Sequence, residues 1–198
     1  MRPVDREAVE ASIRALLDAR DARGAATAAV RSYGPQILAY LRAVLRDEDA
    51  AAEAFSRFAE GLWKGIARFR GDAAVLTWAY RVAWGAVREV RRDPYRRRAR
   101  RLETSEASRL AAEVRESTAS HLRPRDKGAV ERLRASLDPG ERTLLILRLD
   151  RDLPWRDVAM ILSGDGATLD EATVRKRYER VKAKLRKLAS AEGLLATR

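Results

Sequence analysis

The sequence predicts an all-α protein with two small helical domains, a helical bundle followed by a helix-turn-helix, joined by a flexible linker. Two observations lead to this fold class. Apolar residues recur at intervals of three and four along most of the 198 residues, which is the period of an amphipathic helix, and no stretch alternates convincingly as a strand would. Gly34-Pro35 and Gly71-Asp72 are expected to separate helices, because glycine and proline are strong turn signals.

Four apolar stripes predict the helices of the first domain. They are Val9, Ile13 and Leu16; Ile37, Leu41 and Val44; Phe55, Phe58, Leu62 and Ile66; and Leu76, Tyr80, Ala83, Val87 and Val90. The fourth helix carries a second apolar row, Trp78, Val82 and Ala86, so it is expected to be packed on two sides. Asp93-Pro94 should end this helix, because proline disfavours helical geometry in the residue before it.

The predicted linker covers residues 99–124, between domains at residues 1–98 and 125–198. An arginine-rich run, residues 91–101, leads into the linker and holds seven Arg and one Asp. The next stretch, residues 102–122, has four Glu and two Arg but no strong apolar stripe. We expect a polar connection that leans acidic and ends near Pro124.

Four further stripes predict the helices of the second domain. They are Val130, Leu133 and Leu137; Leu144, Leu145 and Leu149; Val158, Ile161 and Leu162; and Val174, Tyr178, Val181, Leu185 and Leu188. A short helix from Pro154, a glycine-containing turn and a long basic helix from Thr173 form the outline of a helix-turn-helix. Asp170 or Thr168 could cap the long helix.

Composition excludes several classes of function. The 41 Lys and Arg residues against 29 Asp and Glu give a net charge of +12, which favours a polyanion, with nucleic acid ahead of an anionic membrane surface. The chain has no cysteine and one histidine, His121, so we expect no metal site, no cofactor and no histidine-centred triad. No apolar stretch is long enough to span a membrane, and the acidic N-terminus does not resemble a signal peptide, so cytoplasmic localisation is expected.

The long basic helix presents candidate DNA-binding side chains opposite its apolar stripe. Arg175 and Lys176 could donate to guanine, and Glu179 could accept from a cytosine amine. Arg180, Lys182 and Lys184 are better placed for phosphates. A solvated basic face on a structural helix remains an alternative.

The second domain resembles region 4 of the extracytoplasmic-function sigma factors, small promoter-specificity subunits of bacterial RNA polymerase. The resemblance rests on LDPGERTLLILRLDRDLPWRDVAMIL, residues 137–162, and on TVRKRYERVKAKLRKL, residues 173–188. The matching positions are Leu137, Arg142, Leu147, Arg148, Leu153, Trp155, Val158, Ala159, Thr173, Val174, Arg177 and Arg180. It implies binding of the −35 promoter element, although the turn over residues 163–172 is longer than usual for the family.

The segment FRGDAAVLTWAYRVA, residues 69–83, resembles region 2 of the same family and implies binding of the melted −10 element. Single-stranded DNA binds where aromatic platforms adjoin basic side chains. The candidates are Arg70, Arg81, Trp84, Arg88, Arg91 and Arg92. Where the family has an Asn associated with the flipped base, this chain has Gly85. Trp84 could stack on that base or could pack on the surface, whereas Phe69, Trp78 and Tyr80 are expected in the core.

The segment AEAFSRFAEGLW, residues 52–63, resembles the helix with which the family grips the β′ clamp of the polymerase core. The expected contacts are Glu53, Phe55, Ser56 and Phe58, and Ser56-Arg57 replaces a Gln-Glu pair of the family. Either Phe could equally be a core residue. The resemblance also implies that region 4 contacts the β flap of the polymerase. It further implies that the linker enters a basic polymerase channel with its acidic residues Glu103, Glu106, Glu113 and Glu116. The alternative is that the linker is a solvated tether.

These features predict an alternative sigma factor that directs promoter recognition, DNA melting and transcription initiation without catalysis of its own. Its expected partners are core RNA polymerase, promoter DNA and an anti-sigma protein, with no membrane insertion and no small-molecule substrate. A second hypothesis is a helix-turn-helix regulator that binds DNA as a dimer without polymerase. An enzyme such as a nuclease is disfavoured, because the adjacent acids Asp47, Glu48 and Asp49 need not converge on a metal.

Overall fold

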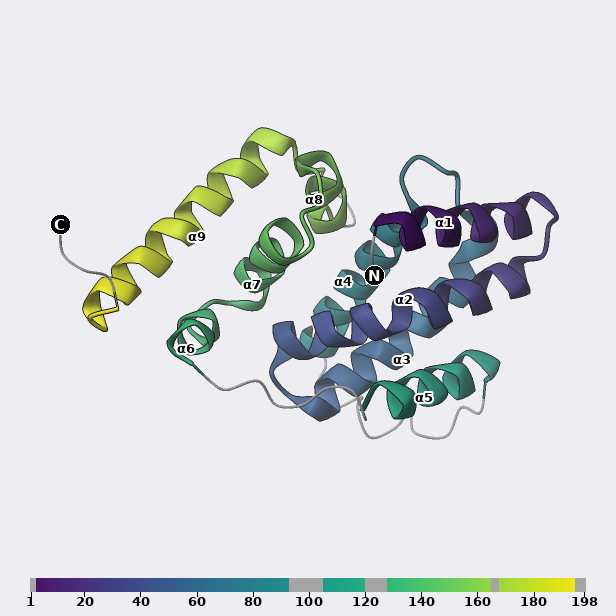
Figure 1. Ribbon diagram of the computed structural model, residues 1–198, viewed down its shortest axis with the longest axis horizontal. Coiled ribbons are helices and arrows are strands. Elements are labelled where there is room, and N and C mark those ends of the chain that lie inside the picture. Colours follow the sequence, from purple (N-terminus) through teal and green to yellow (C-terminus); the bar gives the residue numbers. More distant parts are fainter. Residues whose placement is uncertain (1–2, 93–104, 120–127, 165–167, 195–198) are drawn as a thin grey trace. The chain divides into compact units, whose positions relative to one another are not determined.

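The computed structural model describes residues 3–92, 105–119, 128–164 and 168–194 (Figure 1). These residues form helices and no β-strands, which confirms the all-α prediction. The chain divides into two compact units, Met1–Leu122 and Arg123–Arg198. Within the described residues, no helix is long and apolar enough to cross a membrane.

Unit 1 is a helical bundle. Its elements are α1 (Pro3–Asp18), α2 (Ala22–Leu45), α3 (Glu48–Gly65), a short 3-10 turn η1 (Ile66–Arg68), α4 (Val75–Arg92) and α5 (Glu106–Ala119). Helices α2, α3 and α4 pack on one another, while α1 lies along α2 and α5 lies against α2 and α3 (Figure 1). Five aromatic side chains fill the core with no exposed surface or almost none: Tyr33, Tyr40, Phe55, Phe58 and Tyr80.

Local sequence signals explain several helix ends in unit 1. The described part of α4 reaches Arg92, and the stop predicted at Asp93-Pro94 lies outside the described residues. The carboxylate of Asp47 accepts a hydrogen bond of 2.8 Å from the Ala50 N–H and so caps α3. Glu48 and Asp49 follow in the first turn, where negative charge favours the positive end of the helix dipole. The acidic triplet is therefore the start of a helix.

The predicted break at Gly34-Pro35 is wrong, because α2 continues through both residues. Proline removes one backbone hydrogen bond, which costs a helix interior about 3 kcal/mol relative to alanine. The surrounding side chains offset this cost, since Tyr33, Ile37 and Leu38 are all fully or almost fully buried. Tertiary packing thus overrides the local turn signal.

The expectation of a linker at residues 99–124 is corrected for residues 106–119, which form α5 and pack on the bundle. The buried side chains of α5 are Ala107, Leu110, Ala111, Val114 and Thr118. Their spacing of three, one, three and four residues places them on one helix face. Glu103 and the remaining linker positions, except Ser105, lie outside the described residues.

Two acidic side chains of α5 pair with arginines of α2. Glu106 accepts a hydrogen bond of 2.9 Å from Arg23 Nε, and Glu113 accepts one of 3.3 Å from Arg31 Nη2. Both were expected to face a polymerase channel. In this structure they face arginines of α2 instead, so α2 presents charge complementary to that of α5.

Unit 2 comprises α6 (Ala129–Ala135), α7 (Pro139–Leu145), a π-helical turn η3 (Ile146–Asp150), α8 (Trp155–Leu162) and α9 (Glu171–Ala191). Asp138 and Glu141 form a capping box at the start of α7. Leu147, Val158, Ile161 and Val174 are fully buried, which places the core between η3, α8 and α9. Leu149, predicted to be apolar core, is 59% exposed, because the π turn changes the helical phase after Leu145.

Candidate functional site

The candidate −10 residues gather on the outer face of α4. Arg81, Trp84, Arg88 and Arg91 are spaced by three, four and three residues, so they follow one side of the helix. Arg81 and Arg91 are exposed, as are Arg92 beside them and Arg70 in the preceding loop, whereas Trp84 and Arg88 are half-buried. The opposite side of α4 is buried, with no exposed surface at Tyr80, Ala83, Val87 and Val90. The structure therefore brings the α4 candidates together on one basic face.

This basic face carries charge that no carboxylate of the described residues neutralises. Among the described residues, no carboxylate forms an ion pair with Arg81, Arg88, Arg91 or Arg92. By contrast, Arg42 of α2 and Arg57 of α3 each pair with a glutamate at 2.8 Å. An unpaired row of guanidinium groups creates a positive potential that attracts a polyanion.

Gly85 adjoins Trp84 on this surface and is not required by packing. A Cβ added at Gly85 would meet no atom within 4 Å. Open space therefore exists beside Trp84. Tyr80 is fully buried in the core as expected, whereas Phe69 and Trp78, also expected in the core, are half-buried and pack as a tilted pair with ring centroids 5.6 Å apart.

Glu10 of α1 positions the start of α4, a role that the sequence analysis missed. Its carboxylate accepts hydrogen bonds from the backbone N–H groups of Val75 at 2.8 Å and Leu76 at 2.9 Å. It also accepts one of 2.8 Å from the Tyr33 hydroxyl. Burial, together with this hydrogen bond, raises the pKa of Tyr33 far above its usual value. Glu10 thus satisfies helix N–H groups that would otherwise lack partners.

Phe55 and Phe58, for which the sequence left open a polymerase contact or a place in the core, are core residues in this structure. Both side chains have no exposed surface and pack with ring centroids 5.6 Å apart. They contribute apolar area to the core of unit 1, where no partner can reach them unless an element moves. Glu53 and Ser56 are half-buried on the same helix.

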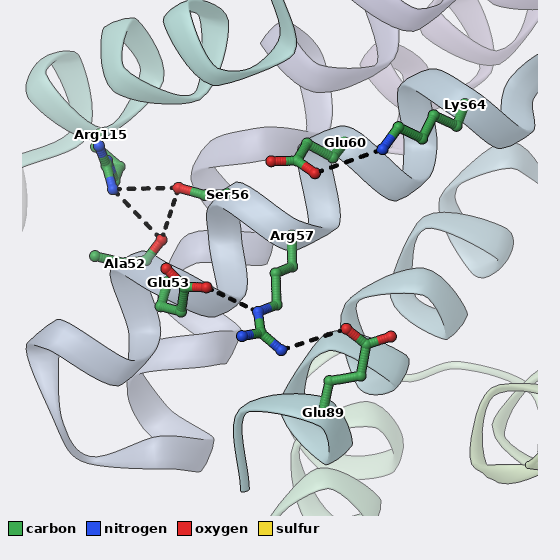
Figure 2. Close-up of polar contacts among 8 residues, drawn as sticks. All are labelled: Ala52, Glu53, Ser56, Arg57, Glu60, Lys64, Glu89 and Arg115. Carbon is green, nitrogen blue, oxygen red and sulfur yellow. Dashed lines mark hydrogen bonds and ion pairs between the residues drawn. The ribbon is translucent and has the colours of Figure 1, made fainter. Parts of the chain in front are cut away.

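Polar contacts of α3 run in two directions, toward α4 and toward α5 (Figure 2). Arg57 Nε donates to Glu53 at 2.8 Å, and Arg57 Nη1 lies 3.4 Å from a carboxylate oxygen of Glu89 in α4. The Ser56 hydroxyl donates to the Ala52 carbonyl at 3.1 Å. The substitution of Arg at position 57 thus links α3 to α4, because its guanidinium bridges the two acids.

Arg115 of α5 covers the other side of α3. Its Nη1 donates to the Ala52 carbonyl at 3.4 Å and to the Ser56 hydroxyl at 3.5 Å (Figure 2). Ser56, one of the expected polymerase contacts, is therefore occupied by a side chain of the same chain.

Helix α9 exposes most of the candidate −35 residues. Asp170 caps it by accepting a 2.7 Å hydrogen bond from the Thr173 N–H, and hydrogen bonds with Thr173 lower the pKa of this carboxyl. Lys176, Glu179 and Arg180 are exposed, as is Lys184, whereas Lys182 is half-buried. Residues 165–167 of the long turn before α9 lie outside the described residues.

Several α9 cations are already paired within unit 2. Arg175 lies 3.2 Å from Glu171, Lys182 lies 2.8 Å from Glu179, and Lys184 lies 2.6 Å from Glu141 in α7. In the part of the chain that the structure describes, no carboxylate forms an ion pair with Lys176 or Arg180. These two are therefore the most available cations of the predicted set.

An aromatic pair joins α8 to α9. Trp155 and Tyr178 meet edge to face with ring centroids 5.3 Å apart. The guanidinium carbons of Arg148 and Arg175 lie 5.0 and 5.6 Å from the Trp155 ring centroid. Cation–π attraction therefore helps to orient Arg175. The sequence analysis counted Trp155 only as a family position.

Comparison with known proteins assigns the bundle of unit 1. Residues 29–102 match the family described as Sigma-70 region 2. The match includes most of α2 and all of α3 and α4, and so contains the basic face and the helix expected to bind polymerase. No curated protein matches the chain. Among the described residues, no group of three or more acidic, His or Cys side chains is arranged to hold a metal ion.

Proposed function

We propose that the chain is a sigma-70 family protein, because residues 29–102 match Sigma-70 region 2, and that it is an alternative sigma factor of the extracytoplasmic-function type. Sigma-70 factors are non-enzymatic initiation factors that act with core RNA polymerase and promoter DNA. The finer proposal is that this chain directs polymerase to its own set of promoters in the cytoplasm and opens the −10 element.

The basic face of α4 is the observation that carries the proposal. It combines unpaired arginines with the half-buried Trp84 inside the segment that matches region 2. Single-stranded DNA requires both a phosphate track and a stacking platform. On this proposal Arg81, Arg91 and Arg92 follow the phosphates, and Trp84 stacks on an unstacked base beside Gly85.

Unit 2 supplies the second DNA contact of the proposal. Helix α9 would enter the major groove of the −35 element, with Arg175, Lys176 and Glu179 near base edges and Arg180 near phosphate. Its described N-terminal turns are exposed, as this role requires. Two weak contacts on one continuous DNA, both anchored on polymerase, reinforce each other.

The first test is binding to purified core polymerase, followed by run-off transcription from a pool of genomic promoters. We expect stable binding and new, discrete start sites. The double variant Arg81→Ala/Arg91→Ala should bind core normally but lose transcription. Arg14→Ala, an exposed arginine of α1, is the matched control and should behave as the parent chain. Dimeric, sequence-specific DNA binding without core binding would instead establish the helix-turn-helix regulator.

A further inference from the structure

Helix α5 lies over the part of α3 that was expected to contact polymerase. A Cβ added at Gly34 of α2 would lie 2.8 Å from Val114 Cγ1 of α5 and 3.3 Å from Phe55 Cζ of α3. The three residues therefore meet at one point, and α5 approaches this closely because residue 34 has no side chain. Phe55 is buried where α2, α3 and α5 converge.

A second contact of α5 falls on the same face of α3. Arg115 reaches the Ala52 carbonyl at 3.4 Å and the Ser56 hydroxyl at 3.5 Å. Phe55 and Ser56, two of the four expected polymerase contacts, are thus beside or beneath α5. Undocking of α5 would free the Ser56 hydroxyl and remove one wall of the Phe55 site.

The attachment of α5 depends mainly on small side chains and on exposed ion pairs. Its buried stripe has only two larger aliphatic side chains, Leu110 and Val114, beside two alanines and a threonine. Its ion pairs are exposed, with side chains 58% and 59% accessible in the Arg31–Glu113 pair, and such pairs contribute little to stability. A helix of 14 residues is also marginal when undocked. Docking can therefore be reversed without unfolding the core.

We propose that α5 is an internal cover of the polymerase-binding face of α3, and that it must leave this face before core polymerase docks. This inference rests on the proposed function. The fraction of molecules with α5 released then sets the apparent affinity for polymerase, because only the released form is competent to bind.

A disulfide lock tests the cover directly. The chain contains no cysteine, so Gly34→Cys/Val114→Cys introduces one possible intramolecular pair. The 2.8 Å separation between the added Cβ and Val114 Cγ1 is close to the distance of about 3 Å between a cysteine Cβ and its partner's sulfur in a disulfide. We expect the oxidised full-length chain to bind core polymerase at least about tenfold more weakly than the same protein after reduction.

The matched control places the same kind of lock on α3 away from α5. A Cβ added at Gly61 would lie 3.0 Å from Val82 Cγ1 of α4, so Gly61→Cys/Val82→Cys can close a comparable bridge. Its oxidised and reduced forms should bind polymerase equally. This control separates an effect of α5 from an effect of stiffening the bundle.

A release variant gives the opposite test. Ala111 is fully buried in α5, so Ala111→Glu should expel α5 while the rest of unit 1 stays folded. We expect tighter binding to core polymerase than the parent chain shows, with helix content lowered by no more than α5. Equal binding by the oxidised and reduced lock would overturn the proposal, and weaker binding by Ala111→Glu would make α5 part of the docking surface instead. Failure of every form, including the reduced lock, to bind core would refute the proposed function itself.

Discussion

Replacement of Glu10 by alanine should destabilise unit 1, because this side chain of α1 serves groups on two other helices. The carboxylate serves the N–H groups of Val75 and Leu76 and the hydroxyl of Tyr33, at 2.8 to 2.9 Å. Loss of a helix cap costs about 1 kcal/mol. An unsatisfied buried hydroxyl costs a further 1–3 kcal/mol, roughly. We therefore expect the free energy of unfolding to fall by about 2–4 kcal/mol in Glu10→Ala.

Urea denaturation followed by tryptophan fluorescence measures this loss. A Trp155→Phe background removes the one tryptophan of unit 2, so that Trp63, Trp78 and Trp84 report on unit 1 alone. Glu7→Ala, an exposed glutamate on the same helix, is the matched control and should change the free energy by less than about 0.5 kcal/mol.

Glu10→Gln refines the reasoning, because it keeps an acceptor oxygen and removes the charge. It should lose less stability than Glu10→Ala, since hydrogen bonds to a charged acceptor are about twice as strong as neutral ones. If Glu10→Ala and Glu7→Ala have the same free energy of unfolding, the cap does not stabilise α4 and the assignment of Glu10 is wrong.

Three further predictions concern the two DNA-binding faces and one carboxylate. Trp84→Ala should slow open-complex formation on a promoter more than it weakens initial binding. A permanganate or fluorescence assay measures the melting rate, and an unchanged rate would mean that Trp84 only packs on the surface. Arg175→Ala should lower promoter selectivity, whereas Arg180→Ala should weaken binding to all sequences and reduce the logarithmic salt slope by about one; equal effects of both on selectivity would contradict the groove assignment. Because the pKa of Asp170 is lowered in the folded state, its contribution to the stability of unit 2 is present above the ordinary carboxyl pKa and is lost as pH falls through the lowered folded value. The stability of the parent chain and of Asp170→Asn should be measured by circular dichroism as the pH is lowered. The loss of stability that comes from Asp170 should be absent in Asp170→Asn. If both proteins lose stability equally with falling pH, the cap does not contribute.

Helix ends and the position of the basic face could be predicted from the sequence, because they depend on nearby residues. Asp170 was one of two proposed caps for α9, and its carboxylate accepts a hydrogen bond from the Thr173 N–H. The arginines of α4 share a face because their spacing follows the helical period. Each of these conclusions depends only on residues that are a few positions apart in the sequence.

Helix α5 escaped prediction because its apolar stripe is made of small side chains. Ala107 and Ala111 contribute little hydrophobic signal, although both are buried, and Leu110 and Val114 alone do not make a strong stripe. Their burial comes from packing on α2 and α3, and Val114 fits there because Gly34, about 80 positions earlier in the chain, has no side chain. A pattern read along one segment contains no information about that space.

The amino-acid sequence by itself determined the all-α class, the positive charge and the row of arginines on α4, because composition and helical period are local properties. Tertiary structure alone decided that Pro35 stays inside α2, that Phe55 and Phe58 are core, that Glu10 caps a helix 65 residues away, and that α5 covers α3. The physical reason is that burial and the satisfaction of backbone groups depend on which distant residues meet, and those meetings outweigh local propensity when they remove apolar surface from water.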